Sequence, residues 1–194
     1  HSPIIQAINA TKHLIMVNGE KKPFQALWTE HSAGKTAAYQ AIFRQDGAAP
    51  NKGAVSQHAA LDREESRWTV TLEKEYVARQ LGLNDIRDIE LFIDHSSNKT
   101  YALRLKSDKE QADVDFVQFQ NKLGEQALPS NDLEVFLKNR DIVFTGYGKG
   151  LGVGMCLYSA SAMAQNGDMA VKILAKFYPD SFLVNLSNTP KDVK

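Results

Sequence analysis

The stretch that decides the fold reads Gly146-Tyr-Gly-Lys-Gly-Leu-Gly-Val-Gly154, with a glycine at every second position. Because side chains alternate across an extended strand, this spacing predicts a strand with one face free of Cβ atoms. The other face carries Tyr147, Lys149, Leu151 and Val153. Glycine weakens a strand, so this pattern, here called the glycine ladder, indicates that something approaches the backbone closely. We expect either a neighbouring element or the ring of a ligand.

The glycine ladder differs from the glycine-rich loops that bind phosphate. A Walker loop has Ser or Thr after its Lys, whereas Lys149 is followed by Gly150 and Leu151. The dinucleotide fingerprint needs a parallel β-α-β continuation, and only about 15 residues, too few for another strand and helix, follow the last predicted helix. The ladder is therefore not predicted to bind a nucleotide.

Composition limits the classes of function. The chain has 194 residues, 43% of them hydrophobic, which is enough to bury a sizeable core. Lys plus Arg and Asp plus Glu both number 23, so no net charge favours nucleic acid or an acidic membrane surface. No apolar run approaches the roughly 20 residues of a membrane helix. The lone Cys156 excludes an intrachain disulfide and a multi-cysteine zinc site.

The first third of the chain is predicted to be extended, then irregular. Residues Ile4 to Thr36 combine extended runs with a hairpin signal, because Leu14 to Val17 and Phe24 to Trp28 flank Asn18-Gly19. The segment Gln40 to Arg67 has no clean period, so we expect a long surface loop.

The remaining chain mixes strands and helices without strict alternation. This pattern predicts an α+β fold with mixed, mainly antiparallel sheets, short helices and two C-terminal helices after the glycine-rich strand. We expect one domain over residues 1–194, with 68–124 as a possible inserted α/β subdomain. The predicted strands are Trp68 to Leu72, Ile86 to Asp94, Tyr101 to Leu105, Leu133 to Leu137 and Ile142 into the ladder; the predicted helices are Glu73 to Leu81, Val114 to Leu123 and two segments separated by Gly167, the second capped by Asp168.

Two separated motifs carry a family resemblance. The first is Val143 to Met155, followed by Tyr158, Ala160, Met163-Ala164, Gly167 and Phe177-Tyr178-Pro179. The second is Ala7 to Thr11, Asn18-Gly19, Ala26 to Trp28 and Ser32 to Thr36. In residues, order and spacing these motifs resemble the stage II sporulation protein D and amidase-enhancer family, and the resemblance covers most of the chain.

That resemblance implies peptidoglycan as the substrate class and an extracytoplasmic location after export. The start at His1-Ser-Pro3, without an initiator Met, suits a processed exported protein or an excised fragment. Active family members are lytic transglycosylases, and relatives stimulate a cell-wall amidase. The cleavage needs one carboxylic acid that protonates the departing glycosidic oxygen and then accepts the proton of the muramyl C6 hydroxyl. No cofactor or metal is expected.

The chain also departs from the family pattern. The family's catalytic Glu lies on a helix upstream of the segment matched by Ile4 to Thr11, so the catalytic residue stays unassigned and we expect an incomplete enzyme. In the ladder, Leu151 replaces a His, Lys149 a Trp, and Cys156-Leu157 a Ser-Gln pair. The family's histidines fall opposite Thr29 and Lys35, whereas this chain has His31.

We predict a glycan-binding cleft between Trp28 to Thr36 and the ladder. Trp28 and Tyr147 offer flat apolar faces for pyranose rings, or are core aromatics. Lys35 and Lys149 suit sugar hydroxyls or a lactyl carboxylate, or are simply solvated. The predicted substrate-binding residues are Trp28, Glu30, His31, Ser32, Gly34, Lys35, Thr36, Tyr147, Lys149, Gly150, Gly152 and Gly154.

Two further interpretations concern pairs of residues. Glu30 and His31 could perform acid–base chemistry, although adjacent residues of a strand point to opposite faces. Cys156 and His31 fall short of the three or four ligands of a usual metal site, so a buried structural cysteine is the favoured interpretation. The alternative to a glycan-binding domain is a non-catalytic activator of a cell-wall amidase, which predicts an exposed apolar patch or strand edge.

Overall fold

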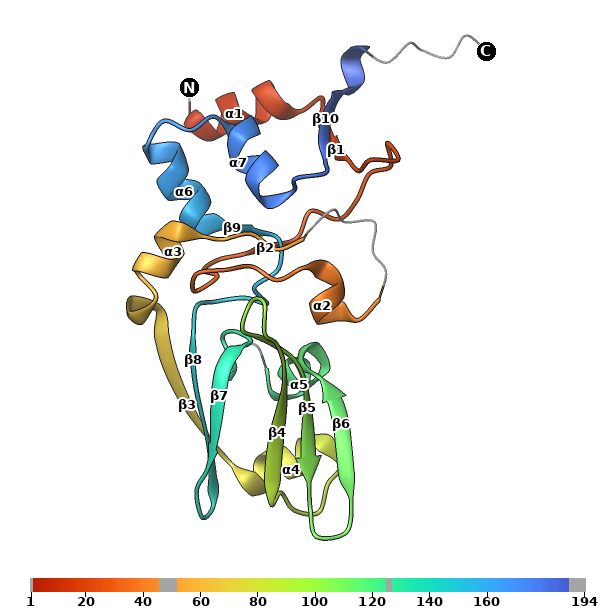
Figure 1. The fold of residues 1–194 in the computed structure, drawn as a ribbon, viewed down its shortest axis with the longest axis vertical. Coiled ribbons are helices and arrows are strands. Elements are labelled where there is room, and N and C mark those ends of the chain that lie inside the picture. Colours follow the sequence, from red (N-terminus) through yellow and green to blue (C-terminus); the bar gives the residue numbers. More distant parts are fainter. Residues whose placement is uncertain (1, 46–51, 125–126, 189–194) are drawn as a thin grey trace.

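The computed structural model describes residues 2–45, 52–124 and 127–188. The fold is α+β, with several small, mostly antiparallel sheets and short helices. Figure 1 shows two three-stranded sheets at one end of the molecule, a largely helical end opposite, and the short strands β2 (Trp28–Thr29) and β9 (Met155–Cys156) between them.

The sheet end contains the largest core. One sheet has the order β3 (Arg67–Glu73), β8 (Asp141–Tyr147) and β7 (Asp132–Leu137); the other has the order β4 (Asp88–Asp94), β5 (Lys99–Lys106) and β6 (Gln111–Asp115). Helices α4 (Lys74–Leu81) and α5 (Phe116–Leu123) complete this end. Residues 68–124 share one core with β7 and β8, which includes Leu103, Phe119 and Phe144.

Sequence periodicity explains these elements. β3 alternates exposed and half-buried residues, as expected for a strand with one packed face. In α4, Val77 and Ala78 are buried, and the helix ends at Gly82, whose φ of 73° few other residues adopt readily. The strands predicted on either side of residues 95–98 and of residues 139–141 form hairpins: β4 pairs with β5 and β7 with β8, both antiparallel.

The opposite end is mainly helical. Helix α6 (Leu157–Gln165) packs with α3 (Gln57–Leu61) and α7 (Ala170–Phe177), around a smaller core that includes Cys156, Ile173 and Phe177. β1 (Leu14–Val17) and β10 (Phe182–Asn185) form an antiparallel ribbon beside it. The other elements are helix α2 (Tyr39–Phe43) and the 3-10 turns Glu64–Ser66 and Leu186–Asn188.

Several expectations for the first third of the chain are wrong. Residues Pro3–Thr11 form helix α1 rather than extended chain. The turn after Asn18 exists, with Asn18 N donating to Lys22 O at 2.9 Å, but β1 pairs with the distant β10 instead of with Phe24 to Trp28. Tertiary pairing has overridden the local hairpin signal. The described parts of Gln40 to Arg67 contain α2, α3 and a 3-10 turn rather than a structureless loop, and 46–51 lie outside the described residues.

Two short strands were not predicted, and one helix starts later in the sequence than expected. β6 occupies Gln111–Asp115, so α5 begins at Phe116. β10 follows the last helix, where no strand was predicted. The residue before α7 is Met169 rather than Asp168.

The glycine ladder is a strand only at its beginning. Gly146 belongs to β8, but Gly148, Gly150, Gly152 and Gly154 all have positive φ, between 62° and 101°. The backbone therefore reverses the sign of φ at every second residue, which glycine alone adopts without strain. The expected extended strand with one bare face is wrong beyond Tyr147, although the every-second spacing does reflect a real alternation of the backbone.

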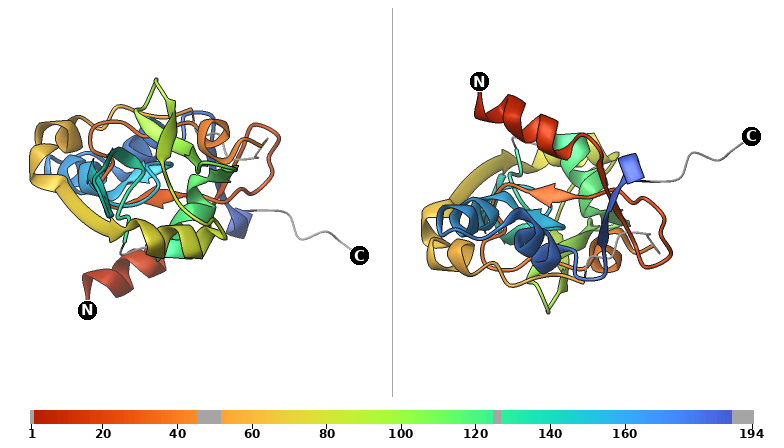
Figure 2. Two further views of the ribbon diagram at one scale, coloured as in Figure 1. Left: turned by 90° about the horizontal axis from the view of Figure 1, so that it is seen from below. Right: turned by 90° about the horizontal axis from the view of Figure 1, so that it is seen from above.

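Helix α1 and the β1–β10 ribbon expose apolar side chains. None of the α1 residues is buried by the part of the chain that the structure describes, and Figure 2 shows the helix projecting from the body. We call this surface the apolar end; its exposed side chains include Ile4, Ile5, Ile8, Leu14, Phe182, Val184 and Leu186. Among the described helices, none is both long and apolar enough to cross a membrane.

Candidate functional site

The segment from Trp28 to Ala37 lies directly along the glycine ladder. β2 runs parallel to β9, with Trp28 opposite Met155. His31 and Lys149 exchange two backbone hydrogen bonds, His31 N to Lys149 O at 3.1 Å and Lys149 N to His31 O at 2.9 Å. Ala37 N donates to Gly152 O at 2.7 Å. The two sequence motifs are therefore neighbours in space.

Protein atoms fill the space that the ladder glycines leave free. A Cβ at Gly148 would lie 2.3 Å from the carbonyl oxygen of His31, and one at Gly154 would lie 1.8 Å from that of Leu27. Gly150 makes room for the Thr29 hydroxyl and Gly152 for the stem of Lys99. Of the two expected explanations, the neighbouring element is correct and the ligand ring is wrong for these four glycines. The glycine ladder is thus the surface on which the second motif packs, and we call this surface the seat of the second motif.

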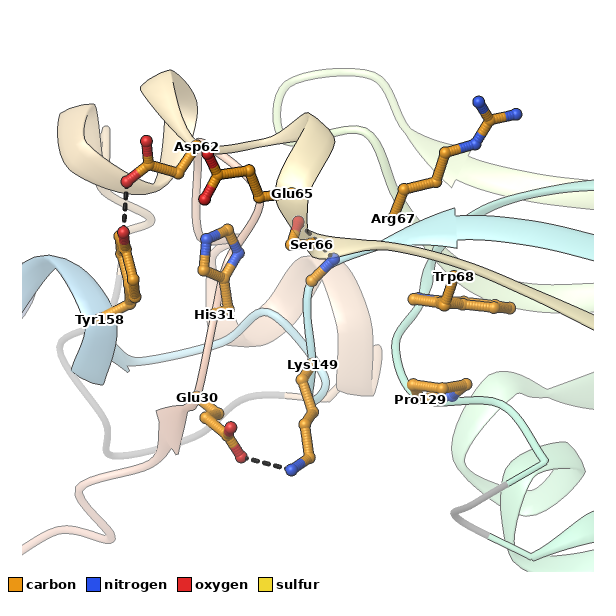
Figure 3. A pocket seen from close by; sticks show the side chains of 11 residues that line it. Glu30, His31, Asp62, Glu65, Ser66, Arg67, Trp68, Pro129, Lys149 and Tyr158 are labelled. Carbon is orange, nitrogen blue, oxygen red and sulfur yellow. Dashed lines mark hydrogen bonds and ion pairs between the residues drawn. The ribbon is translucent and has the colours of Figure 1, made fainter.

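A groove runs beside this seat. Figure 3 shows its first part, a cavity of about 410 Å³ whose lining includes His31, Asp62, Glu65, Trp68 and Tyr158. The second part, of about 540 Å³, has Trp28, Thr29, Gln120 and Leu151 in its lining. Both parts share Glu30, Pro129 and Lys149, so they are two sections of one groove.

The first section is lined by charged side chains and by the rings of His31, Tyr158 and Trp68. The His31 ring packs against Tyr158 with centroids 4.7 Å apart, and the Tyr158 hydroxyl donates to an Asp62 carboxylate oxygen. That bond raises the pKa of Tyr158, so the phenol is neutral at physiological pH. Figure 3 shows Trp68 facing Pro129 on the other side of the section. Its indole Nε1 donates to Ser130 Oγ at 3.0 Å, which fixes the ring.

The second section is more apolar. Trp28 is 62% exposed, so its ring is free to contact a ligand. Leu151 lines the same section, and the nearby Gln120 amide is held by a hydrogen bond to Leu128 O at 2.6 Å. An exposed indole beside fixed polar groups suits a flat ligand with an apolar face, such as a pyranose ring.

An exposed ion pair lies where the two sections of the groove meet. Lys149 Nζ lies 2.8 Å from Glu30 Oε2, and the two side chains are 64% and 56% exposed. Such a pair is weakly held, because water screens it. Both side chains are therefore available to sugar hydroxyls or charged substituents. His31 and Glu30 leave the backbone on different sides, as expected for neighbours in extended chain, but both border the groove.

A buried charge cluster holds the second motif from behind. Asp132, which is 3% exposed, accepts hydrogen bonds from Lys99 at 2.7 Å and from Arg63 at 2.8 and 3.0 Å. Lys99 also donates to Ser32 O at 2.8 Å and Arg63 to Ala33 O at 2.7 Å. Burial lowers the pKa of Lys99, and Asp132 opposes that shift. The hydrogen bond to Asp132 raises the pKa of Arg63.

The remaining predicted site residues serve the framework. Ser32 is buried, and its N–H donates to Cys156 Sγ at 3.4 Å. Thr36 Oγ1 accepts from Ala54 N at 2.9 Å, and Lys35 Nζ donates to Ser96 O at 2.6 Å. Gly34 O accepts from Ser56 N at 2.8 Å, and Tyr147 lies under the Arg63 guanidinium at 4.0 Å. The predicted residues that line the groove are Trp28, Glu30, His31, Lys149 and Gly150.

Sequence reasoning missed most of the other lining residues. Asp62 and Glu65 lie in the segment predicted to be an irregular loop, and Tyr158 was read only as part of a family motif. The missed buried centre, Lys99 and Asp132, had one signal: two strands whose first residue is charged.

Among residues 2–45, 52–124 and 127–188, no group of three or more His, Cys, Asp or Glu side chains is arranged to hold a metal ion. Searches with protein-family models and among curated proteins found no match to this chain. The family resemblance of the two motifs therefore stays a prediction, and function has to be argued from the groove itself.

Proposed function

We propose that this protein binds glycan strands of peptidoglycan in the groove between the second motif and β3. The observation that carries the proposal is one groove in two connected sections, with Trp28 exposed in one and Tyr158 and Trp68 in the other. Sugar chains alternate apolar ring faces with polar edges, and this lining alternates in the same way. The family resemblance supports the same substrate class and an extracytoplasmic location.

Cleavage of the strand is not part of this proposal. A carboxylic acid that protonates a leaving oxygen needs a buried, apolar setting. Glu30 and Glu65 are exposed, and Asp62 is engaged by Tyr158. Among the described residues that line the groove, no carboxylic acid therefore has the setting of a general acid, and we expect the groove to bind glycan without cleaving it.

Co-sedimentation and calorimetry with glycan strands stripped of stem peptides test the proposal. The protein should bind the strands without releasing anhydromuramyl products. Trp28→Ala should weaken binding at least about tenfold, as is common for a central aromatic contact. Phe136→Ala is the matched control, because Phe136 is an exposed aromatic residue on β7 outside the lining of the groove.

Failure of the wild-type protein to bind the strands would overturn the proposal, and equal losses in the two variants would remove the groove as the site. Release of anhydromuramyl products would instead overturn the expectation that the groove binds the strand without cleaving it.

A second candidate function is activation of a cell-wall amidase through the apolar end. The exposed Ile4, Ile8, Phe182 and Val184 favour it, because exposed apolar side chains gathered in one region often mark a protein interface. The protein should raise the rate of a cell-wall amidase, and Phe182→Asp should abolish the effect while Phe136→Asp should not. An unchanged amidase rate on addition of the wild-type protein would exclude this function.

A further inference from the structure

A backbone hydrogen bond holds the neutral His31 ring in one tautomer. The Ala33 N–H donates to His31 Nδ1 at 3.2 Å. A backbone N–H can only donate, so Nδ1 has to offer its lone pair and the neutral ring carries its proton on Nε2. The turn that makes this bond is fixed: Ala33 has a φ of 55°, its carbonyl is bound by Arg63, and Ser32 O is bound by Lys99.

The surroundings of His31 favour the same form. Burial lowers the pKa of His31, and the cations Lys99 and Arg63 act in the same direction, whereas Asp62 and Glu30 oppose them. Glu65, Lys149 and Tyr158 also line this section of the groove. Figure 3 shows the ring beside Tyr158, pointing toward Asp62 and Glu65. A neutral imidazole with a fixed Nε2–H therefore lies next to two carboxylates in an open cavity.

We infer that His31 is a specificity-determining residue that recognises the acetamido group of a 2-acetamido sugar. Its Nε2–H donates to the acetamido carbonyl oxygen, and a neighbouring carboxylate, Asp62 or Glu65, accepts the acetamido N–H. A hydroxyl at the same position carries its donor and its acceptor on one atom, whereas the acetamido group presents them on two separate atoms, and an ammonium offers no acceptor to Nε2–H. This inference rests on the proposed glycan binding and names the sugar substituent that the groove recognises.

The inference predicts how affinity depends on pH. Protonation of His31 places a hydrogen on Nδ1, where the Ala33 N–H already points, so the imidazolium breaks that turn. Affinity should stay constant above the pKa of His31, which lies below 6.5, and fall by up to about tenfold per pH unit beneath it. The pKa of His31 should also drop when the ligand binds, because the ligand selects the neutral ring.

Two variants and three tetrasaccharides test the inference. We expect the tetramer of N-acetylglucosamine to bind at least about tenfold more tightly than the glucosamine tetramer or cellotetraose. His31→Phe, which keeps a ring against Tyr158 but has no donor, should lose that preference. His31→Gln, which keeps an N–H donor at similar reach, should retain most of it. Nitrogen-15 NMR of the histidine side chains should show the Nε2–H form of His31 in the free protein.

The possible results separate this inference from the proposed function. If glycan strands bind but His31→Phe keeps the full preference, or if NMR shows a proton on Nδ1 at pH 7.5, the inference is wrong and glycan binding stands. If the three tetrasaccharides bind equally, acetamido recognition is excluded in the same way. If neither strands nor tetrasaccharides bind, both the inference and the proposed function fail.

Discussion

Two sets of opposite charges hold the same short segment, Thr29 to Ala33, in different ways. Behind it, the buried Asp132 accepts hydrogen bonds from Asn98 and from the two cations Lys99 and Arg63. The two cations also donate to the carbonyl groups of Ser32 and Ala33. In front of it, Glu30 and Lys149 form a single pair in water. The buried cluster fixes the shape of the segment, whereas the exposed pair borders both sections of the groove and can separate without unfolding. Burial, rather than the presence of an ion pair, separates framework from binding surface.

The largest expected effect comes from the buried cluster. Asp132→Asn leaves two cations without their shared carboxylate, and breaking a buried pair in this way costs about 3–5 kcal/mol of unfolding free energy. Denaturant unfolding measures the loss. Asp113→Asn is the control, since it breaks the exposed pair with Arg104, which water screens, and its cost should be far smaller. Similar losses of stability in both variants would show that burial does not distinguish the two kinds of ion pair.

A single added methyl group can disrupt the packing of the second motif on the glycine ladder. Gly154→Ala combines a φ of 83° with a contact of 1.8 Å to Leu27 O, so we expect a loss of about 2–4 kcal/mol from strain and overpacking. Thermal unfolding is the measurement.

Gly167→Ala is the matched control for this change. Its φ is 88°, but a Cβ there meets no described atom within 4 Å, so only the backbone strain of about 1 kcal/mol remains. A loss in Gly167→Ala as large as that in Gly154→Ala would show that close approach to Leu27 does not matter.

The exposed pair should contribute little to stability. A double-mutant cycle with Glu30→Gln and Lys149→Met is expected to give a coupling of about 0.2–1 kcal/mol, decreasing as salt is added. Glycan affinity should respond more strongly than stability, because both side chains border the groove. A coupling above about 3 kcal/mol would place this pair with the buried cluster instead.

The smallest expected effect is a pH dependence of stability from His31. Its pKa in the folded protein is lowered from 6.5, so the unfolded chain binds the proton more readily. The stabilisation is therefore complete above pH 6.5 and is lost as the pH falls through the folded pKa. The difference in melting temperature between the wild type and His31→Gln should narrow or change sign across that window. A difference independent of pH would show that His31 does not titrate with folding.

The sequence predicted local structure well and distant pairing poorly. The helix Glu73 to Leu81 and the two hairpins around residues 95–98 and 139–141 form because their periodicity and turn residues act over short separations. The partner of β1 could not be inferred, since the Asn18-Gly19 signal favours the neighbouring segment over β10. The fold class follows from the mixture of elements, which local patterns do predict.

The sequence predicted that the two motifs are neighbours, but the expected cleft between them is filled by their direct contacts, and the groove lies beside them. The spacing of the ladder glycines signalled a close backbone neighbour, which is Leu27 to His31 together with Lys99. Asp62, Glu65 and Tyr158 reach the groove only because α3 and α6 pack together, and no pattern in the sequence reports that contact. The Lys99–Asp132 pair likewise depends on two strand starts meeting beneath the ladder.

The seat of the second motif also bears on how the chain folds during synthesis. Thr29 Oγ1 and Lys149 O are joined across 120 positions, so residues 27–37 have to wait for almost the whole chain before their partner exists. The two sheets between them, from β3 to β8, contain their own core and can collapse earlier. Contacts of such long separation form slowly. The groove is thus assembled only after most of the chain has been made, and the β1–β10 ribbon, which pairs Leu14 with Asn185, has to wait longer still.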